Sequence, residues 1–265
     1  MILQQIIGHK KQELAQEMQQ FPLSKMMELA TASPPPKDFV GAIRSPGKVN
    51  IIAEVKRRSP SKGLLCPNFN HLTLAKAYVD AGAAAISVLT DENFFGGHNR
   101  FLTDIREEIC LPLLRKDFII HPYQIYQTKV LGADAVLLIV SALDERTLSE
   151  LYQIAKNIGL AVLVEVHSKS EVLTALEIGV DLIGINNRNL HTFETDITTT
   201  FKLRRLINPE ITVVSESGIK DSSHMAGLAR HNINAVLIGE TLVTASNPSV
   251  KLTRLLVGGE YNEQP

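Results

Sequence analysis

Lysine and glutamate side chains stand at the ends of several apolar stretches of this chain. The run Ile51-Ile52-Ala53-Glu54-Val55-Lys56 opens with β-branched residues, which indicate a buried strand, and continues into a loop containing Ser, Pro and Gly. Side chains alternate between the faces of a strand, so Glu54 and Lys56 should point the same way. Later apolar runs end similarly, in Lys116, Glu165, Asn186 and Glu216. Together these groups suggest acid and base catalysis.

Each of these residues also has a purely structural interpretation. Lys116 could be a rim lysine paired with Asp117, and Glu165 could cap the helix after His167. Two lysines and three glutamates that converge on one place are nevertheless hard to explain by packing, because buried charges are costly unless they are paired. Their proximity would also separate their pKa values, as acid and base catalysis requires.

The elements that position these residues alternate along the chain. Strands are predicted at 49–56, 84–90, 112–116, 135–140, 161–166, 181–186, 211–216 and 235–239. Helical patterns lie at 72–81, 123–131, 143–158, 170–178 and 222–230, and glycines follow several of them, at Gly82, Gly132, Gly159 and Gly179. Alternating strands and helices favour a parallel sheet. Eight such units match an α/β fold of the closed (β/α)8, or TIM, barrel type better than an open doubly wound sheet.

A helical segment precedes the first strand. Residues 2–19 and 23–30 favour two helices, the first only weakly amphipathic, and Pro34-Pro35-Pro36 ends the segment. We therefore predict an N-terminal helical extension at 1–48, packed on a catalytic barrel at 49–265, with a single domain overall. The active site of such a barrel lies at the C-terminal ends of its strands, which brings the charged residues to one mouth.

Two loops have the features of a phosphate site. In (β/α)8 barrels, the loops after strands seven and eight often bind phosphate with the N-terminus of a short helix. Here they contain Ser217-Gly218-Ile219 and Gly239-Glu240-Thr241. Small residues let backbone N–H groups approach phosphate oxygens, and Ser217 adds a hydroxyl donor. Ordinary turn chemistry is the alternative, and Glu240 would repel a phosphate unless its side chain turns away.

Composition and missing motifs narrow the class of protein. The chain has 27 basic and 28 acidic residues, so its net charge does not indicate nucleic acid or an anionic membrane as partner. Cys66 and Cys110 stand far apart, and the histidines lack metal-ligand spacing. Nucleotide-binding glycine motifs and a serine nucleophile elbow are missing as well. Without a secretory signal or a transmembrane run, we expect a cytoplasmic enzyme with no metal site.

A set of motifs along the chain identifies a resemblance to a known family. The motifs are Ile52-Ala53-Glu54-Val55-Lys56 with Ser59-Pro60-Ser61-Lys62-Gly63, Ser87-Val88-Leu89-Thr90-Asp91, Leu114-Arg115-Lys116-Asp117-Phe118, Val164-Glu165-Val166-His167, Gly184-Ile185-Asn186-Asn187-Arg188 and Ser215-Glu216-Ser217-Gly218-Ile219. These motifs resemble those of the indole-3-glycerol-phosphate synthases and occur in the same order as in that family. Members of the family are carboxy-lyases of tryptophan biosynthesis. The resemblance covers about residues 38–256.

This resemblance implies a barrel whose N-terminal segment closes part of the mouth. It also implies a reaction: 1-(2-carboxyphenylamino)-1-deoxyribulose 5-phosphate is cyclised, decarboxylated and dehydrated to indole-3-glycerol phosphate. No cofactor or metal is expected. The partner would be this phosphorylated small molecule, and we expect no nucleic acid, membrane or obligatory protein partner.

The resemblance assigns roles to individual residues. Lys116 would be the general acid of ring closure, Lys56 would bind the substrate carboxylate and act in dehydration, and Glu165 would be the general base. Residues that orient these groups and the sugar hydroxyls would be Glu54, Asn186 and Glu216. The substrate would be bound through its phosphate by Ser217, Gly218, Gly239 and Ser59, and elsewhere by Phe95, Phe118, Leu137 and Arg188. Which lysine serves which step stays open.

Two other functions stay open at this point. A Schiff-base aldolase on the same barrel would use Lys116 or Lys56 as nucleophile toward a phosphosugar, and borohydride would trap its lysine adduct. A catalytically silent phosphate-binding barrel is the other alternative. It would require loss of the charges at the strand ends, and those charges are all present.

Overall fold

The computed structural model describes residues 2–189 and 192–259. Within these residues, eight parallel strands close into a barrel in the order β1-β10-β9-β8-β7-β6-β5-β4. The strands are β1 (Asn50–Val55), β4 (Ala85–Leu89), β5 (Leu113–Lys116), β6 (Ala135–Ile139), β7 (Ala161–Val166), β8 (Leu182–Asn186), β9 (Thr212–Glu216) and β10 (Ala235–Ile238). The prediction of a (β/α)8 barrel is confirmed.

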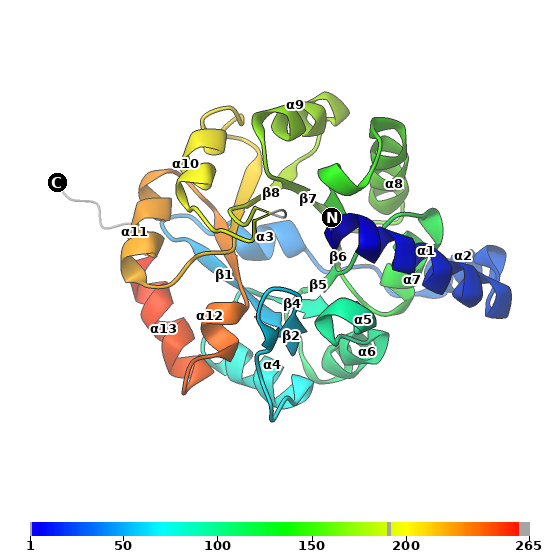
Figure 1. Cartoon of the computed structure of the whole chain (residues 1–265), viewed down its shortest axis with the longest axis horizontal. Coiled ribbons are helices and arrows are strands. Elements are labelled where there is room, and N and C mark those ends of the chain that lie inside the picture. Colours follow the sequence, from blue (N-terminus) through cyan, green and yellow to red (C-terminus); the bar gives the residue numbers. More distant parts are fainter. Residues whose placement is uncertain (1, 190–191, 260–265) are drawn as a thin grey trace.

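Helices form a ring around the strands (Figure 1). The longer ones are α4 (His71–Asp80), α6 (Asn99–Glu108), α7 (Pro122–Val130), α8 (Glu145–Asn157), α9 (Lys169–Ile178), α10 (Thr198–Arg204), α11 (Ser222–Arg230) and α13 (Pro248–Gly258). Short elements are the hairpin of β2 (Arg58–Ser59) and β3 (Gly63–Leu64), α5 (Glu92–Phe95), the 3-10 helix η1 (Val140–Ala142) and α12 (Glu240–Val243). The predicted helical patterns correspond to α4, α7, α8, α9 and α11. None of the helices in the described ranges has the length and apolar character needed to span a membrane.

The segment before β1 forms three helices, α1 (Ile2–Gln20), α2 (Leu23–Ala32) and α3 (Phe39–Ile43). The start of α1 lies over the barrel, and α1 leads outward to α2 at its side (Figure 1). There Leu14 and Met26 pack with Tyr123 of α7. Phe39 and Ile43 of α3 belong to the apolar cluster inside the barrel. The segment therefore contacts the barrel at several places.

Side chains along the strands alternate between the outer face, which packs on the helices, and the barrel interior. The interior contains an apolar layer and a charged layer. Ile51, Ala53 and Val55 of β1 face the surrounding helices, whereas Ile52 faces the barrel interior. On several strands an apolar residue faces inward, and the next inward residue is charged and lines a cavity. These pairs are Ile52 and Glu54, Leu114 and Lys116, Leu163 and Glu165, and Val214 and Glu216. The interior thus changes from apolar to charged where the strands end.

Candidate active site

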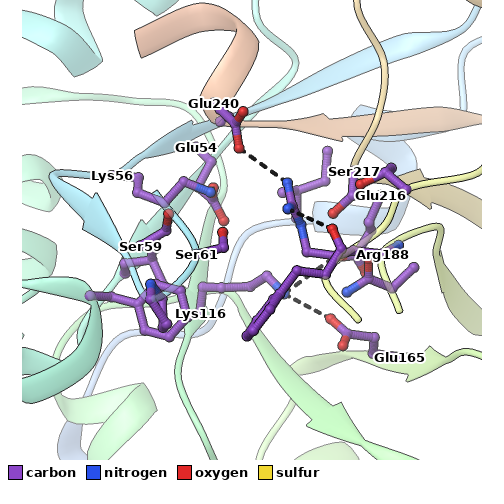
Figure 2. A pocket seen from close by; sticks show the side chains of 18 of the residues that line it. Glu54, Lys56, Ser59, Ser61, Lys116, Glu165, Arg188, Glu216, Ser217 and Glu240 are labelled. Atoms are coloured by element: carbon purple, nitrogen blue, oxygen red, sulfur yellow. Dashed lines mark hydrogen bonds and ion pairs between the residues drawn. The ribbon is translucent and has the colours of Figure 1, made fainter. Parts of the chain in front are cut away.

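A cavity of about 410 Å³ opens at the C-terminal ends of the barrel strands. Every site residue predicted from the sequence lies in its wall: Glu54, Lys56, Ser59, Phe95, Lys116, Phe118, Leu137, Glu165, Asn186, Arg188, Glu216, Ser217, Gly218 and Gly239. Figure 2 shows several of these side chains directed toward a common space from different strands. The structure therefore brings the predicted residues together in one cavity.

Lys116 lies at the centre of the charged layer. Its Nζ is 2.8 Å from Glu165 Oε2 and 3.1 Å from Glu216 Oε2, and both carboxylates are buried (Figure 2). The alternative that Lys116 pairs with Asp117 is wrong, because neighbouring residues on a strand point to opposite faces. Asp117 instead contacts Arg115, at 3.2 Å, behind the strand. Lys116 is thus held by two carboxylates inside the cavity.

The three groups differ in their affinity for protons. Burial by itself would lower the pKa of Lys116, but the charges of Glu165 and Glu216 outweigh it and raise this pKa. Burial would raise the pKa of Glu165, but Lys116 lowers it below its usual range. Burial raises the pKa of Glu216 to about 7, and the charge of Glu165 adds to this increase. Near neutrality the site therefore holds a protonated amine, an ionised carboxylate and a carboxyl group close to its own pKa.

Glu54 and Lys56 form a second ion pair in the wall of the cavity. Lys56 Nζ lies 2.5 Å from Glu54 Oε2, and the Glu54 side chain is 5% exposed. The end of the neighbouring strand β10 leaves room for this pair. A Cβ atom added at Gly239 would collide with the Glu54 carboxylate and lie 3.0 Å from Lys56 Nζ. The Glu54 side chain can therefore occupy this position only because residue 239 is a glycine.

His167 contacts the other oxygen of Glu165, a contact that the sequence analysis did not predict. His167 Nε2 lies 3.4 Å from Glu165 Oε1, and its Nδ1 lies 3.3 Å from Glu171 Oε2. The alternative that Glu165 caps helix α9 is wrong, because the Ser168 hydroxyl accepts the hydrogen bond from Glu171 N–H at 3.3 Å. Glu165 is consequently committed to the cavity and not to the helix end.

The loop after β9 has an unusual backbone. Ser217 has φ 66° and Gly218 has φ 80°, and positive φ is uncommon for a residue with a side chain. Asn187 supports this loop, since its Nδ2 donates to the Ser217 carbonyl oxygen at 3.0 Å. Strained backbone of this kind is retained where a loop is held in one position. After the adjacent strand β10, helix α12 begins directly after Gly239. The first N–H groups of a helix have no partners inside the helix.

Glu240 forms ion pairs beside these loops. Its Oε2 lies 3.1 Å from Arg188 Nη2 (Figure 2). Its Oε1 lies 3.9 Å from Lys62 Nζ. Arg188 also donates to the Phe193 carbonyl oxygen at 3.3 Å. The two cations balance the negative charge of Glu240. This pairing joins residues far apart in the sequence, so no local motif indicated it.

Apolar residues form another part of the cavity wall. The Phe95 and Phe118 ring centroids are 6.0 Å apart, and Leu137 lies deeper in the barrel. Helix α1 adds an apolar surface that the sequence analysis did not assign to the site, namely Ile2, Leu3 and Ile6. The spacing of Ile2 and Ile6, which places them on one helix face, was the available signal. Among the described residues, no cluster of His, Cys, Asp or Glu has the arrangement of a metal site.

Sequence comparison relates this chain to a known family. A family model described as indole-3-glycerol phosphate synthase matches residues 3–255. The chain belongs to the indole-3-glycerol phosphate synthase family. The indole-3-glycerol phosphate synthase of Desulforamulus reducens is 46% identical over 264 residues, which cover 99% of this chain and 100% of that protein. The one from Burkholderia ambifaria is 45% identical over 257 residues, covering 96% and 98% of the two chains. The family resemblance is thereby confirmed.

Solved structures share the fold of this indole-3-glycerol phosphate synthase family member at low identity. The 3-hexulose-6-phosphate synthase from Salmonella typhimurium has a TM-score of 0.64 and 14% identity, over 79% of this chain and 98% of that one. KGPDC from Streptococcus mutans has a TM-score of 0.61 and 14% identity, over 80% and 97%. At such identities the likeness concerns the barrel fold alone.

Proposed function

We propose that this chain converts 1-(2-carboxyphenylamino)-1-deoxyribulose 5-phosphate to indole-3-glycerol phosphate, carbon dioxide and water. The observation that carries the proposal is Lys116, buried between Glu165 and Glu216 in a cavity that also holds Lys56 and the Ser217 loop. Membership of the indole-3-glycerol phosphate synthase family supports the choice of reaction.

Ring closure forms a carbon–carbon bond between the aromatic ring and the ketone carbon of the sugar. The ketone oxygen gains a proton as its π electrons leave the bond, so a positioned acid accelerates this step. Lys116 is that acid in our proposal. The carboxylates of Glu165 and Glu216 raise its pKa and keep it protonated until substrate arrives. They also hold the ammonium group in one position.

Decarboxylation then returns the electrons of the breaking carbon–carboxylate bond to the ring system. Lys56 binds the substrate carboxylate until this step, and Glu54 at 2.5 Å orients the ammonium group. Dehydration follows, in which a hydroxyl group takes up a proton and leaves as water while a base removes a proton from the ring system. Glu165, whose pKa is lowered by Lys116, is the base in this proposal, and Lys56 supplies the acid. Asn186 orients these groups from the neighbouring strand.

The substrate binds across the cavity between two kinds of surface. Its phosphate lies at the loops that contain Ser217, Gly218, Gly239 and Ser59, beside the Arg188 cation. Its aromatic ring lies against Phe95, Phe118 and Leu137. The raised pKa of Lys116 disfavours this residue as the nucleophile of a Schiff-base aldolase, because a lysine nucleophile must lose its proton to attack a carbonyl group.

A direct assay tests the proposal. The purified chain is mixed with the substrate in metal-free buffer, without other proteins, and indole fluorescence is followed. We expect product from the wild-type chain, which would also support our expectations of no metal, cofactor or obligatory protein partner. We propose a cytoplasmic location as well, which cell fractionation tests.

Two variants examine the assigned roles. We expect Lys116→Met to lower kcat by about a thousandfold, because the acid is lost. Glu165→Gln should lower kcat far more than it raises KM. Lys76→Met is the matched control, since this lysine is 52% exposed and pairs with Glu108 on the outside of the barrel. Near wild-type turnover in Lys116→Met, or a lysine adduct trapped by borohydride, would contradict the proposal.

A further inference from the structure

A buried lysine joins helix α1 to the barrel beside the cavity. Lys10 has a side chain only 4% exposed, and its Nζ lies 3.1 Å from Asp117 Oδ1 and 3.3 Å from Asp91 Oδ2. Glu13, on the same helix, is the third partner at 2.7 Å. Lysine is almost never buried this deeply unless its charge is paired. The ammonium group therefore connects α1 to two separate segments of the barrel.

Asp91 fixes the segment that carries one of the aromatic residues of the cavity. It is the N-cap of α5, and its Oδ1 accepts hydrogen bonds from Phe94 N–H at 2.8 Å and Phe95 N–H at 3.2 Å. Its other oxygen, Oδ2, is buried and receives no hydrogen bond within the described ranges. The ammonium group of Lys10 faces that oxygen. Without Lys10, Asp91 would keep a buried charge without its cation.

Asp117 fixes the end of β5 in the same way. It directly follows the buried lysine of that strand, and its Oδ1 accepts a hydrogen bond from Phe118 N–H at 2.8 Å. Its Oδ2 accepts from the Thr90 hydroxyl at 2.6 Å and from Arg115 Nη2 at 3.2 Å. The charges of Lys10 and Arg115 lower the pKa of Asp117 in spite of its burial. Lys10 thus contacts the carboxylates that hold the segments of both Phe95 and Phe118.

Helix α1 has a different environment on either side of Lys10. The residues before it, Ile2, Leu3 and Ile6, form part of the cavity wall. After it, Leu14 packs with Met26 and Tyr123 at the side of the barrel. Lys10 therefore lies between the part of α1 that packs near α2 and α7 and the part that lines the cavity.

We propose that Lys10 is a positioning residue of the active site. Its ammonium group ties α1 to the ends of β4 and β5, and so fixes both the apolar wall made by α1 and the backbone that carries Phe95 and Phe118. Lys10 acts on binding of the aromatic half of the substrate and leaves the proton transfers to other residues. The kinetic part of this inference rests on the proposed function.

The test uses the full chain, three variants with changes at Lys10 and one control variant. Lys10→Met keeps the length of the side chain and removes its charge, whereas Lys10→Arg restores a cation. The double variant Lys10→Met with Asp91→Asn removes the carboxylate left without a partner, so a folded protein is available even if the single variant is unstable. Lys25→Met is the matched control, because Lys25 lies on α2 with a 52% exposed side chain paired with Glu28.

Hydrogen exchange of the backbone amides, measured by mass spectrometry, gives a readout that does not depend on activity. In Lys10→Met we expect amides of residues 2–9 to exchange faster by about tenfold or more, while the barrel strands keep their protection. Lys10→Arg should restore most of this protection, and Lys25→Met should match the wild type. Unchanged exchange of α1 in a folded Lys10→Met or double variant would overturn the proposal.

The kinetic readout separates positioning from a merely structural role. We expect Lys10→Met to raise KM by about tenfold with kcat within about threefold of wild type. The loops proposed to bind phosphate lie after β9 and β10. The affinity of the variant for inorganic phosphate should therefore stay unchanged. A loss of kcat without a change in KM would overturn the proposal. If the wild-type chain lacked synthase activity, the proposed function would fail, while exchange of α1 would still test the tether by Lys10.

Discussion

Glu216 shows how a single side chain in this cavity depends on its surroundings. Its carboxyl group is buried, with the charges of Glu165 and Glu54 nearby, whereas Lys116 favours its ionised form. The adjacent strand leaves space for it, because a Cβ atom at Gly184 would collide with Glu216 Oε1. Catalytic groups held in this way commonly reduce the stability of the fold. The raised pKa of Glu216 gives a means of measuring that effect.

The substitution Glu216→Gln tests the effect of this carboxyl group on stability. The pKa of Glu216 rises from its usual 4.5 to about 7 on folding, so between these pH values the folded protein holds a proton that the unfolded chain has lost. This group therefore lowers the free energy of unfolding as pH rises through that window. We expect Glu216→Gln to be more stable than wild type at pH 8, by about 2 kcal/mol, and to lose this advantage near pH 4.5.

Urea unfolding at pH 4.5, 6 and 8 measures the effect. Glu108→Gln serves as the control, since Glu108 is 49% exposed and its ion pair with Lys76 is on the surface. A Glu216→Gln variant that is less stable than wild type at pH 8 would contradict the assignment of a raised pKa.

At this scale the sequence predicted which residues reach the cavity but not how they pair. Glu54, Lys116, Glu165 and Glu216 could be found because each ends an apolar strand, and strand ends meet at one mouth of a barrel. The pairing of Lys116 with Glu165 and Glu216, in place of Asp117, follows from contacts between strands. Contacts of this kind depend on register and twist, which a local pattern does not contain.

At the scale of elements, the strands and the first helix were predictable, but the buried face of that helix was not. Runs rich in Val, Ile and Leu that end in polar residues are distinctive, and each predicted strand has a counterpart in the barrel. Helix α1 buries Ile6, Lys10 and Leu14. A lysine in the middle of this buried face makes the helix look weakly amphipathic, because hydrophobic periodicity counts lysine as a surface residue. The partners of Lys10 lie on the barrel, so the burial of this side chain depends on the tertiary fold.

The junction of β1 and β10 offers a test of how elements share the site. Gly239→Ala would place a methyl group where the Glu54 carboxylate lies. We expect this variant to fold and to lose about a hundredfold in kcat/KM, because the Glu54–Lys56 pair must move. Gly227→Ala, within α11, is the control: its nearest neighbour is Phe201 Cζ at 3.5 Å, an ordinary contact. It should retain activity and gain about 0.5–1 kcal/mol of stability. Wild-type kinetics in Gly239→Ala would contradict the importance of this contact.

At the scale of the whole molecule, ligand binding and stability are linked through the strained loop after β9. Ser217 has a left-handed backbone that glycine adopts more easily. We expect Ser217→Gly to raise the free energy of unfolding by about 0.5–1 kcal/mol without ligand. The loss of the hydroxyl donor should weaken phosphate binding, so inorganic phosphate would stabilise the variant less than the wild type.

Thermal unfolding with increasing inorganic phosphate measures both effects in one series. Ser223→Gly, in the first turn of α11, is the matched control, and its phosphate response should equal that of the wild type. Equal stabilisation of Ser217→Gly and wild type by phosphate would contradict a role for this hydroxyl.

The global fold itself was predictable, since alternation of strands and helices leaves few topologies. The single-domain arrangement of 1–48 with 49–265 stays a prediction.

The closing pair of the barrel joins two strands from opposite ends of the barrel sequence. Ala53 on β1 pairs with Ile238 on β10, and this pairing sets the Glu54 carboxylate beside Gly239. Contacts between such distant segments carry a high loop-closure entropy, so they form slowly during folding. Until β10 inserts, β1 and β9 each present an open edge, on which chains can aggregate. Catalytic activity during refolding would therefore report closure of the barrel.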